Sequence, residues 1–141
     1  MCSSDLTRAG AVLGPGYYPE ANGEMLTFAM IETADGLKNV EAIVATPGLD
    51  GIYIGPSDLS LAIGGLPLQD SDDPKLMAAF DKILTACKAA GVKACVHTTS
   101  PAYAQAMIAR GFDLVTIMGD VRYLMSGRHD MAEMRSWLDE L

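Results

Sequence analysis

The sequence predicts an α/β domain with parallel strands, of a size that matches half of an eight-stranded βα barrel. Short apolar runs alternate with amphipathic stretches, no linker or low-complexity segment divides the chain, and the chain has only 141 residues. Such alternation favours parallel strands joined by right-handed crossovers. An eight-stranded barrel takes about 250 residues and a flavodoxin-like sheet has five strands, so four strand–helix units match half a barrel best.

Four apolar runs are the expected strands, and the first is nearly continuous, as in a strand buried on both faces. The runs are Leu26–Ile31, Gly51–Gly55, Val92–Val96 and Leu114–Met118. Amphipathic stretches that follow the runs predict the helices. They are Ala34–Ala45, Pro74–Ala90, Pro101–Arg110 and Val121–Leu141, the last interrupted by Ser126-Gly127.

The residues at the expected helix ends support these boundaries. Asp73 and Ser100 each stand before a proline, as capping residues do at the start of a helix. Gly91 and Gly111 follow Ala90 and Arg110, where a left-handed helix end favours glycine. Pro47-Gly48 is expected to stop the first helix.

Composition excludes several classes of protein. Half of the residues are hydrophobic and a fifth are charged, which excludes a disordered chain. The net charge of −8 is opposite to that of a nucleic-acid-binding protein. No apolar run reaches the ~18 residues of a membrane helix. The first residues show no charged segment followed by an apolar one, so we expect no secretion signal. Three cysteines do not form a disulfide framework, so we expect a cytoplasmic protein.

The first six residues do not belong to the expected fold. Met1–Leu6 reads MCSSDL, which has neither a hydrophobic period nor a capping pattern. It resembles the translated end of a sequencing adapter, and a short polar N-terminus is the alternative. We expect residues 1–6 to be non-native and residues 7–141 to form the domain.

Two acidic residues follow neighbouring strands, at the end of a parallel sheet where functional groups gather. Glu32 comes directly after the first strand, and Asp58 follows the second within Gly55-Pro56-Ser57-Asp58. Glu32 alone is more often a partner of a helix start, and Asp58 alone more often binds backbone amides of a Gly-Pro-Ser turn. Together they predict a site for Mg²⁺ or Mn²⁺, because both provide hard oxygen ligands.

Other residues near the strand ends have weaker assignments. Gly55 and Pro56 allow the backbone to approach a substrate, and the amides of Ser57 and Asp58 are candidate anion donors. His97 has the position of a general base, although a hydrogen-bonded wall residue is the more usual role. Cys87 and Cys95 belong to apolar patterns and are expected in the core.

Two segments resemble a known enzyme family. Met30–Gly36 (MIETADG) and Thr46–Ser60 (TPGLDGIYIGPSDLS) closely resemble the class II pyruvate aldolases. This is the family of 4-hydroxy-2-oxoheptanedioate aldolase and 2-dehydro-3-deoxyglucarate aldolase, and it is related to the citrate-lyase β chain. The likeness extends from about Thr7 to the C-terminus.

The resemblance implies a (β/α)8 barrel of which this chain supplies the C-terminal half, strands five to eight. It implies that Glu32 and Asp58 bind Mg²⁺ or Mn²⁺, with Co²⁺ also able to serve. It places Gly55, Pro56, Ser57 and Asp58 at the substrate, together with Met30 and Arg8. Met30 stands where the family often has a glutamine. The family's catalytic histidine and arginine lie in the first half, so no catalytic residue is assigned here.

The activity implied is cleavage of a 4-hydroxy-2-oxo acid into pyruvate, or a related 2-oxo acid, and an aldehyde. Two alternatives stay open: an acyl-CoA lyase of the citrate-lyase β type, and a half-barrel that binds or assembles without catalysis. We expect the chain alone to be an inactive fragment. The full-length protein is expected to form a homo-oligomer and to bind neither nucleic acid nor membrane.

Overall fold

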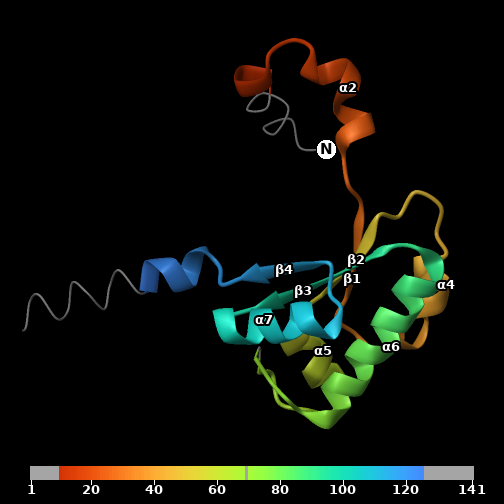
Figure 1. Ribbon diagram of the computed structural model, residues 1–141, viewed down its shortest axis with the longest axis vertical. Helices are drawn as coiled ribbons and strands as arrows, with labels where there is room; N and C mark the ends of the chain where they lie inside the picture. The colour runs from red at the N-terminus through yellow and green to blue at the C-terminus, as the bar shows by residue number, and fades with distance from the viewer. Residues whose placement is uncertain (1–9, 69, 126–141) are drawn as a thin grey trace, which may run out of the picture.

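The computed structural model describes residues 10–68 and 70–125, and its centre is one sheet of parallel strands in the order β1-β2-β3-β4 (Figure 1). The strands are β1 (Phe28–Ile31), β2 (Gly51–Ile54), β3 (Lys93–Thr98) and β4 (Leu114–Ile117). Each neighbouring pair is parallel. Every predicted apolar run therefore contains or overlaps a strand, which confirms the expected α/β architecture.

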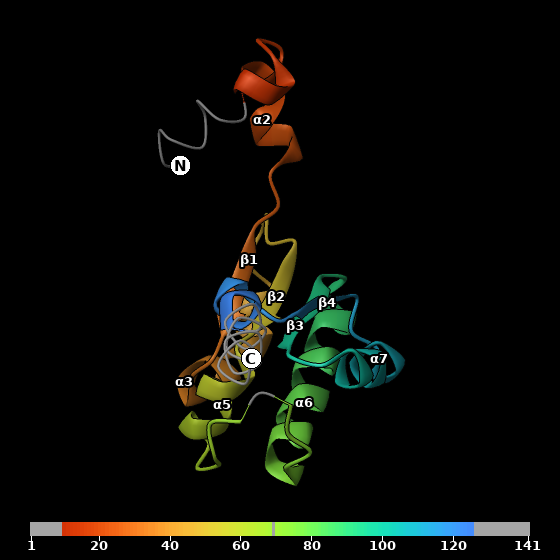
Figure 2. The same ribbon diagram turned by 90° about the vertical axis from the view of Figure 1, so that its left-hand side faces the viewer.

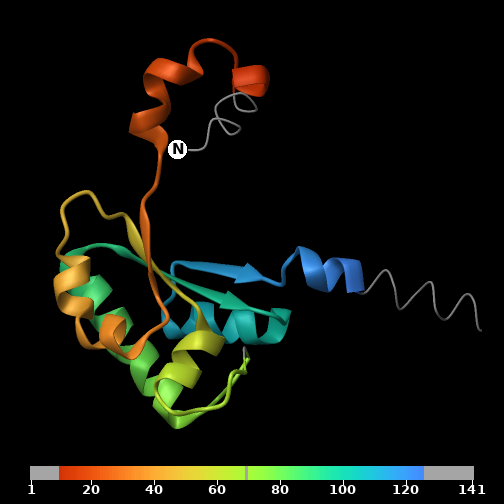
Figure 3. The same ribbon diagram turned by 180° about the vertical axis from the view of Figure 1, so that it is seen from behind.

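Five helices follow the strands and pack on one face of the sheet (Figures 1 and 3). They are α3 (Ala34–Lys38), α4 (Val40–Val44), α5 (Pro56–Ala62), α6 (Pro74–Ala90) and α7 (Pro101–Arg110). The core between the layers combines alternate strand residues with apolar helix residues such as Leu76, Phe80 and Ile83. Phe80 meets the ring of Phe112 edge-on, with centroids 5.5 Å apart.

The predicted helix ends are confirmed where capping chemistry is strong. Asp73 accepts a hydrogen bond from the Lys75 amide at 2.7 Å, and Ser100 accepts one from the Tyr103 amide at 3.2 Å. Gly91 ends α6 with a φ of 73°, in the left-handed region that favours glycine. Helices α6 and α7 consequently have the predicted bounds.

Three helical features differ from the sequence prediction. The expected helix over residues 34–45 is broken at Asn39, whose side-chain amide donates to the Asp35 carbonyl at 2.9 Å. Pro56 opens α5, so Gly55-Pro56-Ser57 starts a helix where we expected a turn. Helix α2 (Tyr17–Glu24) was not predicted because its sequence has no apolar period, and it stands apart from the sheet (Figures 1 and 2).

The face of the sheet opposite the helices is not covered by any described element, and we call it the inner face. Alternate strand residues point to it, and several are exposed apolar side chains: Phe28, Met30 and Leu114. The expectation that the first strand is buried on both faces is therefore wrong for this chain. β1 and β4 each keep one edge that pairs with no described strand. These are the features of half of a barrel.

The described part of the chain contains no helix with the length and apolar character needed to cross a bilayer. Residues 120–125 are helical, as predicted for the start of the last helix. The rest of the predicted C-terminal helices, residues 126–141, lie outside the described residues, as do residues 1–9.

Candidate metal and substrate site

The carboxyl ends of the strands carry one row of residues across the inner face. The last register shared by all strands joins core residues: Ile31, Ile54, Val96 and Val115. The next residues along the chain, in the same order, are Glu32, Gly55, His97 and Thr116. Because successive side chains alternate between faces, this second row points to the inner face. We call these four residues the rim layer.

The two predicted metal ligands converge at Gly55. A Cβ atom placed on Gly55 would lie 3.2 Å from Oε2 of Glu32 and 3.9 Å from Oδ2 of Asp58. Glu32 reaches this point from the end of β1, and Asp58 reaches it from the first turn of α5. Glu32 and Asp58, which the sequence analysis paired because they follow neighbouring parallel strands, are therefore close together in space.

This pair of acids fits a divalent ion that keeps open coordination positions. Glu32 is half-buried and Asp58 is exposed, so the space beside Gly55 is accessible to water and to a ligand. Within residues 10–68 and 70–125, no third histidine, cysteine or acidic residue joins them. Two carboxylates without further protein ligands suit Mg²⁺ or Mn²⁺, which bind few carboxylates and retain waters or substrate oxygens.

The start of α5 provides backbone donors next to the acids. Gly55 is the N-cap of α5 and has no side chain to cap the helix, and the buried Pro56 occupies the first turn. The amides of Ser57 and Asp58 belong to the first turn of the helix, where backbone amides have no partner within the helix. Their position agrees with the predicted role as anion donors.

The other predicted substrate residues have different outcomes. Met30 is exposed on the inner face, one layer below Glu32 and beside Tyr53 in the strand register. It therefore shares a surface with the two acids. Arg8 lies outside the described residues, so its predicted position is not described.

His97 belongs to a hydrogen-bonded group that the sequence analysis did not identify. Nδ1 of His97 lies 2.9 Å from Oγ1 of Thr116, and Tyr53 places its hydroxyl 2.6 Å from the same Oγ1 and 3.4 Å from Nδ1. Thr98, the next residue in the sequence, points to the core and donates to the Thr116 carbonyl at 3.0 Å. Strict alternation along β2, β3 and β4 is the signal that could have found the group.

A second space opens beside the acids. A cavity of about 460 Å³ is lined by Ser57, Pro67, Leu68, Asp70, Thr99 and Arg122. Asp70 accepts a hydrogen bond from the Thr99 amide at 2.8 Å. Burial opposes ionisation of Asp70, but hydrogen bonds from Thr99 and Ser100 outweigh it and lower the pKa of the carboxyl. Asp70 thus connects two loops through this hydrogen bond.

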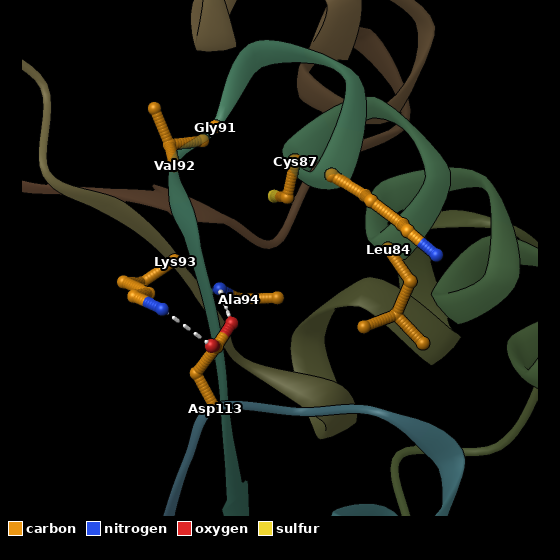
Figure 4. Close-up of a pocket in the computed structure, with 8 residues that line it drawn as sticks. Leu84, Cys87, Gly91, Val92, Lys93, Ala94 and Asp113 are labelled. Atoms are coloured by element: carbon orange, nitrogen blue, oxygen red, sulfur yellow. Dashed lines mark hydrogen bonds and ion pairs between the residues drawn. The ribbon is translucent and has the colours of Figure 1, made fainter.

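The opposite end of the sheet contains a smaller cavity of about 210 Å³ (Figure 4). The residues that line it have structural roles. Asp113 bridges the ammonium of Lys93 at 2.8 Å and the amide of Ala94 at 3.0 Å. Burial raises the pKa of the nearby Cys87 thiol to about 11. A thiol with so high a pKa stays protonated and is a poor nucleophile, which agrees with the predicted core role of this cysteine.

Comparisons with known proteins identify the family of the chain. The sequence profile of the HpcH/HpaI aldolase/citrate lyase family matches residues 4–125. A hydroxypyruvate/pyruvate aldolase of Rhizorhabdus wittichii is 34% identical over 87% of this chain and 49% of its own length. A 5-keto-4-deoxy-D-glucarate aldolase of Enterobacter sp. is 31% identical over 84% of this chain and 46% of its own length. The chain thus spans about half the length of these curated relatives.

Solved structures show the same relation. An HpcH/HpaI aldolase/citrate lyase family protein from Burkholderia cenocepacia superposes with a TM-score of 0.71 and 33% identity, over 89% of this chain and 49% of that one. The protein CitE from Mycobacterium tuberculosis, solved with magnesium and acetate, superposes with a TM-score of 0.54 and 25% identity. That match covers 67% of this chain and 45% of CitE. The four-stranded sheet therefore corresponds to half of a barrel of this family.

Proposed function

The chain belongs to the HpcH/HpaI aldolase/citrate lyase family, and from this premise we propose that it provides the metal-binding half of a metal-dependent aldolase. The substrate is a 4-hydroxy-2-oxo acid, and the products are pyruvate, or a related 2-oxo acid, and an aldehyde. The convergence of Glu32 and Asp58 beside Gly55 is the observation that carries this proposal. The names of the aldolase relatives support it.

Glu32 and Asp58 hold the divalent ion, Mg²⁺ or Mn²⁺, in this proposal. When bound, such an ion supplies Lewis-acid stabilisation of the negative charge that develops on the 2-oxo acid as the carbon–carbon bond breaks. The amides of Ser57 and Asp58 bind the carboxylate of the 2-oxo acid and fix its orientation. Because Gly55 has no side chain, the space beside Glu32 stays open for the substrate. Any side chain at this position would approach Glu32 and fill that space.

The proton acceptor for the 4-hydroxyl group comes from outside this chain in our proposal. Glu32 and Asp58 serve as ligands, and a ligand carboxylate does not act as the base at the same time. The base and the cationic group that offsets the developing charge belong to the other half of the barrel, as the family resemblance implies. A reaction therefore needs both halves.

An acyl-CoA lyase of the citrate-lyase β type is the second candidate function. The likeness to a CitE protein that was solved with magnesium and acetate is the observation that favours it. Both reactions use a carbonyl compound bound through oxygen atoms, so the same two acids serve either one. Release of pyruvate from a 4-hydroxy-2-oxo acid, compared with cleavage of an acyl-CoA thioester, distinguishes the two.

The test is metal binding and turnover in the complete polypeptide that carries these residues. We expect Glu32→Gln and Asp58→Asn each to weaken Mn²⁺ binding, measured by electron paramagnetic resonance, by more than about tenfold. Turnover should fall by about 10²–10³-fold or more, because stabilisation of the developing charge is lost. Glu41→Gln is the matched control, since Glu41 is an exposed acid on α4 that faces Lys82 at 3.6 Å. If both site variants bind Mn²⁺ as the wild type does, the assignment of the ligands is wrong.

A further inference from the structure

The rim layer places His97 directly across Gly55 from Glu32. Glu32, Gly55 and His97 follow register partners on adjacent strands, so they lie at one level and on one face of the sheet. Neighbouring strands are about 4.8 Å apart, which sets the Cα atoms of Glu32 and His97 about 10 Å from each other. Because the residue between them is a glycine, no side chain of the layer separates the carboxylate from the imidazole.

The hydrogen bonds of Nδ1 favour one tautomer of the neutral imidazole. If Nδ1 carried the proton and donated to Thr116, the hydroxyl of Thr116 would donate to Tyr53, and the Tyr53 proton would have no acceptor among the described residues. An unmade hydrogen bond of a half-buried group is costly. If Tyr53 donates to Thr116 and Thr116 donates to Nδ1, both hydroxyl protons have a hydrogen-bond acceptor. Nδ1 is then the acceptor, and Nε2 carries the hydrogen.

Nε2 of His97 remains available to a ligand. No residue in the described part of the chain hydrogen-bonds to it, and His97 is only half-buried. Polar side chains are unusual inside a barrel, where branched apolar residues dominate. The two strands that flank β3 nevertheless each contribute one polar side chain, Tyr53 and Thr116, to hold this ring. The group therefore has the features of a preorganised donor.

We propose that Nε2–H of His97 donates a hydrogen bond to an oxygen on the aldehyde fragment of the substrate, with Tyr53 and Thr116 as positioning residues. This inference rests on the proposed function, because it requires the 2-oxo acid end of the substrate to lie at Glu32 and Asp58. The fragment beyond the breaking bond then extends over Gly55 toward His97. An uncharged N–H donor recognises a hydroxyl oxygen better than an alkyl group, so the preferred class is the 2-hydroxyaldehydes.

Glycolaldehyde and propionaldehyde make a matched pair for the test, because they have the same number of heavy atoms and differ by a hydroxyl in place of a methyl group. The complete polypeptide is assayed for aldol addition of pyruvate to each aldehyde in the presence of Mn²⁺. The measured quantity is the ratio of kcat/KM for glycolaldehyde to kcat/KM for propionaldehyde. We expect His97→Leu to lower this ratio about tenfold, the usual effect of one neutral hydrogen bond.

Two conservative variants separate the nitrogen atoms of the ring. His97→Gln places an amide donor near the position of Nε2 and should keep most of the wild-type ratio. His97→Asn reaches only the position of Nδ1 and should lower the ratio as His97→Leu does. Thr116→Val should lower the ratio about threefold to tenfold by releasing the ring. Thr85→Val is its matched control, because the Thr85 hydroxyl donates to the Asp81 carbonyl on the outer helix α6.

Nitrogen-15 NMR of the histidine side chain gives a readout that does not depend on turnover. We expect the His97 signals of the neutral ring to show a protonated Nε2 and an unprotonated Nδ1, and a mixture of tautomers in Tyr53→Phe and Thr116→Val. A protonated Nδ1 in the wild type overturns the inference. An equal loss of kcat/KM for both aldehydes in His97→Leu also overturns it, while the proposed function stands. Absence of any turnover by the wild type, with either aldehyde or in pyruvate release, overturns both.

Discussion

Gly55 is the residue on which the site depends most, although it carries no functional group. Its backbone angles, φ −91° and ψ 94°, are open to any amino acid, so the requirement for glycine is one of space. The side chains of Glu32 and Asp58 converge where a Cβ would be, and the rim layer is open from Glu32 to His97 at this point. The absence of a side chain therefore shapes both the proposed metal site and the approach to it.

Gly55→Ala should weaken the metal site and leave the fold intact. The new methyl group would lie 3.2 Å from Oε2 of Glu32, so this carboxylate must shift by a few tenths of an ångström. We expect Mn²⁺ affinity to fall about tenfold, as for other displaced ligands, with an unchanged melting temperature. Titration with Mn²⁺ and thermal denaturation measure the two effects. Gly23→Ala is the control, since a Cβ at Gly23 meets nothing within 4 Å. Unchanged affinity in Gly55→Ala contradicts this account of the site.

At the scale of the elements, the chain contains the same type of helix-to-strand connection at two places. The segments Gly48-Leu49-Asp50 and Gly111-Phe112-Asp113 each lead from a helix into a strand, with their glycines at φ 80° and 117°. Asp50 accepts a hydrogen bond from the amide of Thr27, directly before β1, and Asp113 accepts one from the amide of Ala94 in β3. Each aspartate donates its own amide to the carbonyl of the same partner. The aspartate thus sets the register at the start of the new strand.

Asp113→Asn should destabilise the protein in a pH-dependent way. The Lys93 ammonium and the Ala94 amide lower the pKa of Asp113 below its usual 3.8. A carboxyl with a lowered pKa in the folded state stabilises the fold above its usual pKa, and the contribution is lost as the pH falls through the lower value. In the complete polypeptide we expect a melting temperature about 2 °C lower at pH 7, because the pair is partly exposed. The difference in melting temperature between the variant and the wild type should shrink between pH 4 and pH 2. A difference that stays constant would contradict the link between this stability and the ionisation of Asp113.

At the scale of the whole molecule, the described sheet has helices α3 to α7 on one face and exposed apolar side chains on the other. β1 and β4 each have one edge without a strand partner among the described residues, and Phe28, Met30 and Leu114 are exposed on the inner face. In a closed barrel, further strands pair with both edges and fill this face. The same closure would bring the other wall of the site opposite Glu32 and Asp58.

Residues 7–141 expressed alone should not catalyse the aldol reaction. Without the other half, the base and the cationic group are absent, and each commonly contributes about 10²–10⁴-fold to the rate. Open edges and exposed apolar surface should also cause association, visible by analytical ultracentrifugation. Pyruvate release from 4-hydroxy-2-oxo acids with Mg²⁺ or Mn²⁺, followed with lactate dehydrogenase, measures the activity. Turnover within tenfold of a complete relative would contradict this prediction.

The sequence predicted most of the strands and helices because their signals are local. Apolar runs marked β1 to β4, and capping residues such as Asp73 and Gly91 marked the bounds of α6. Helix α2 escaped prediction because its sequence lacks an apolar period, so no local signal marks it. The break at Asn39 goes with a side-chain hydrogen bond from Asn39 to the Asp35 carbonyl, which a pattern of apolar residues does not reveal.

For the candidate site, the sequence alone was enough to pair Glu32 with Asp58, because parallel topology brings the ends of adjacent strands to one rim. Only the tertiary structure decided which side chains share a layer, because that depends on the register between strands distant in sequence. Register placed Gly55 between Glu32 and His97, and it joined Tyr53, His97 and Thr116 from three strands. A one-residue slip would turn each of these side chains to the other face, so no local pattern could replace the fold in setting them.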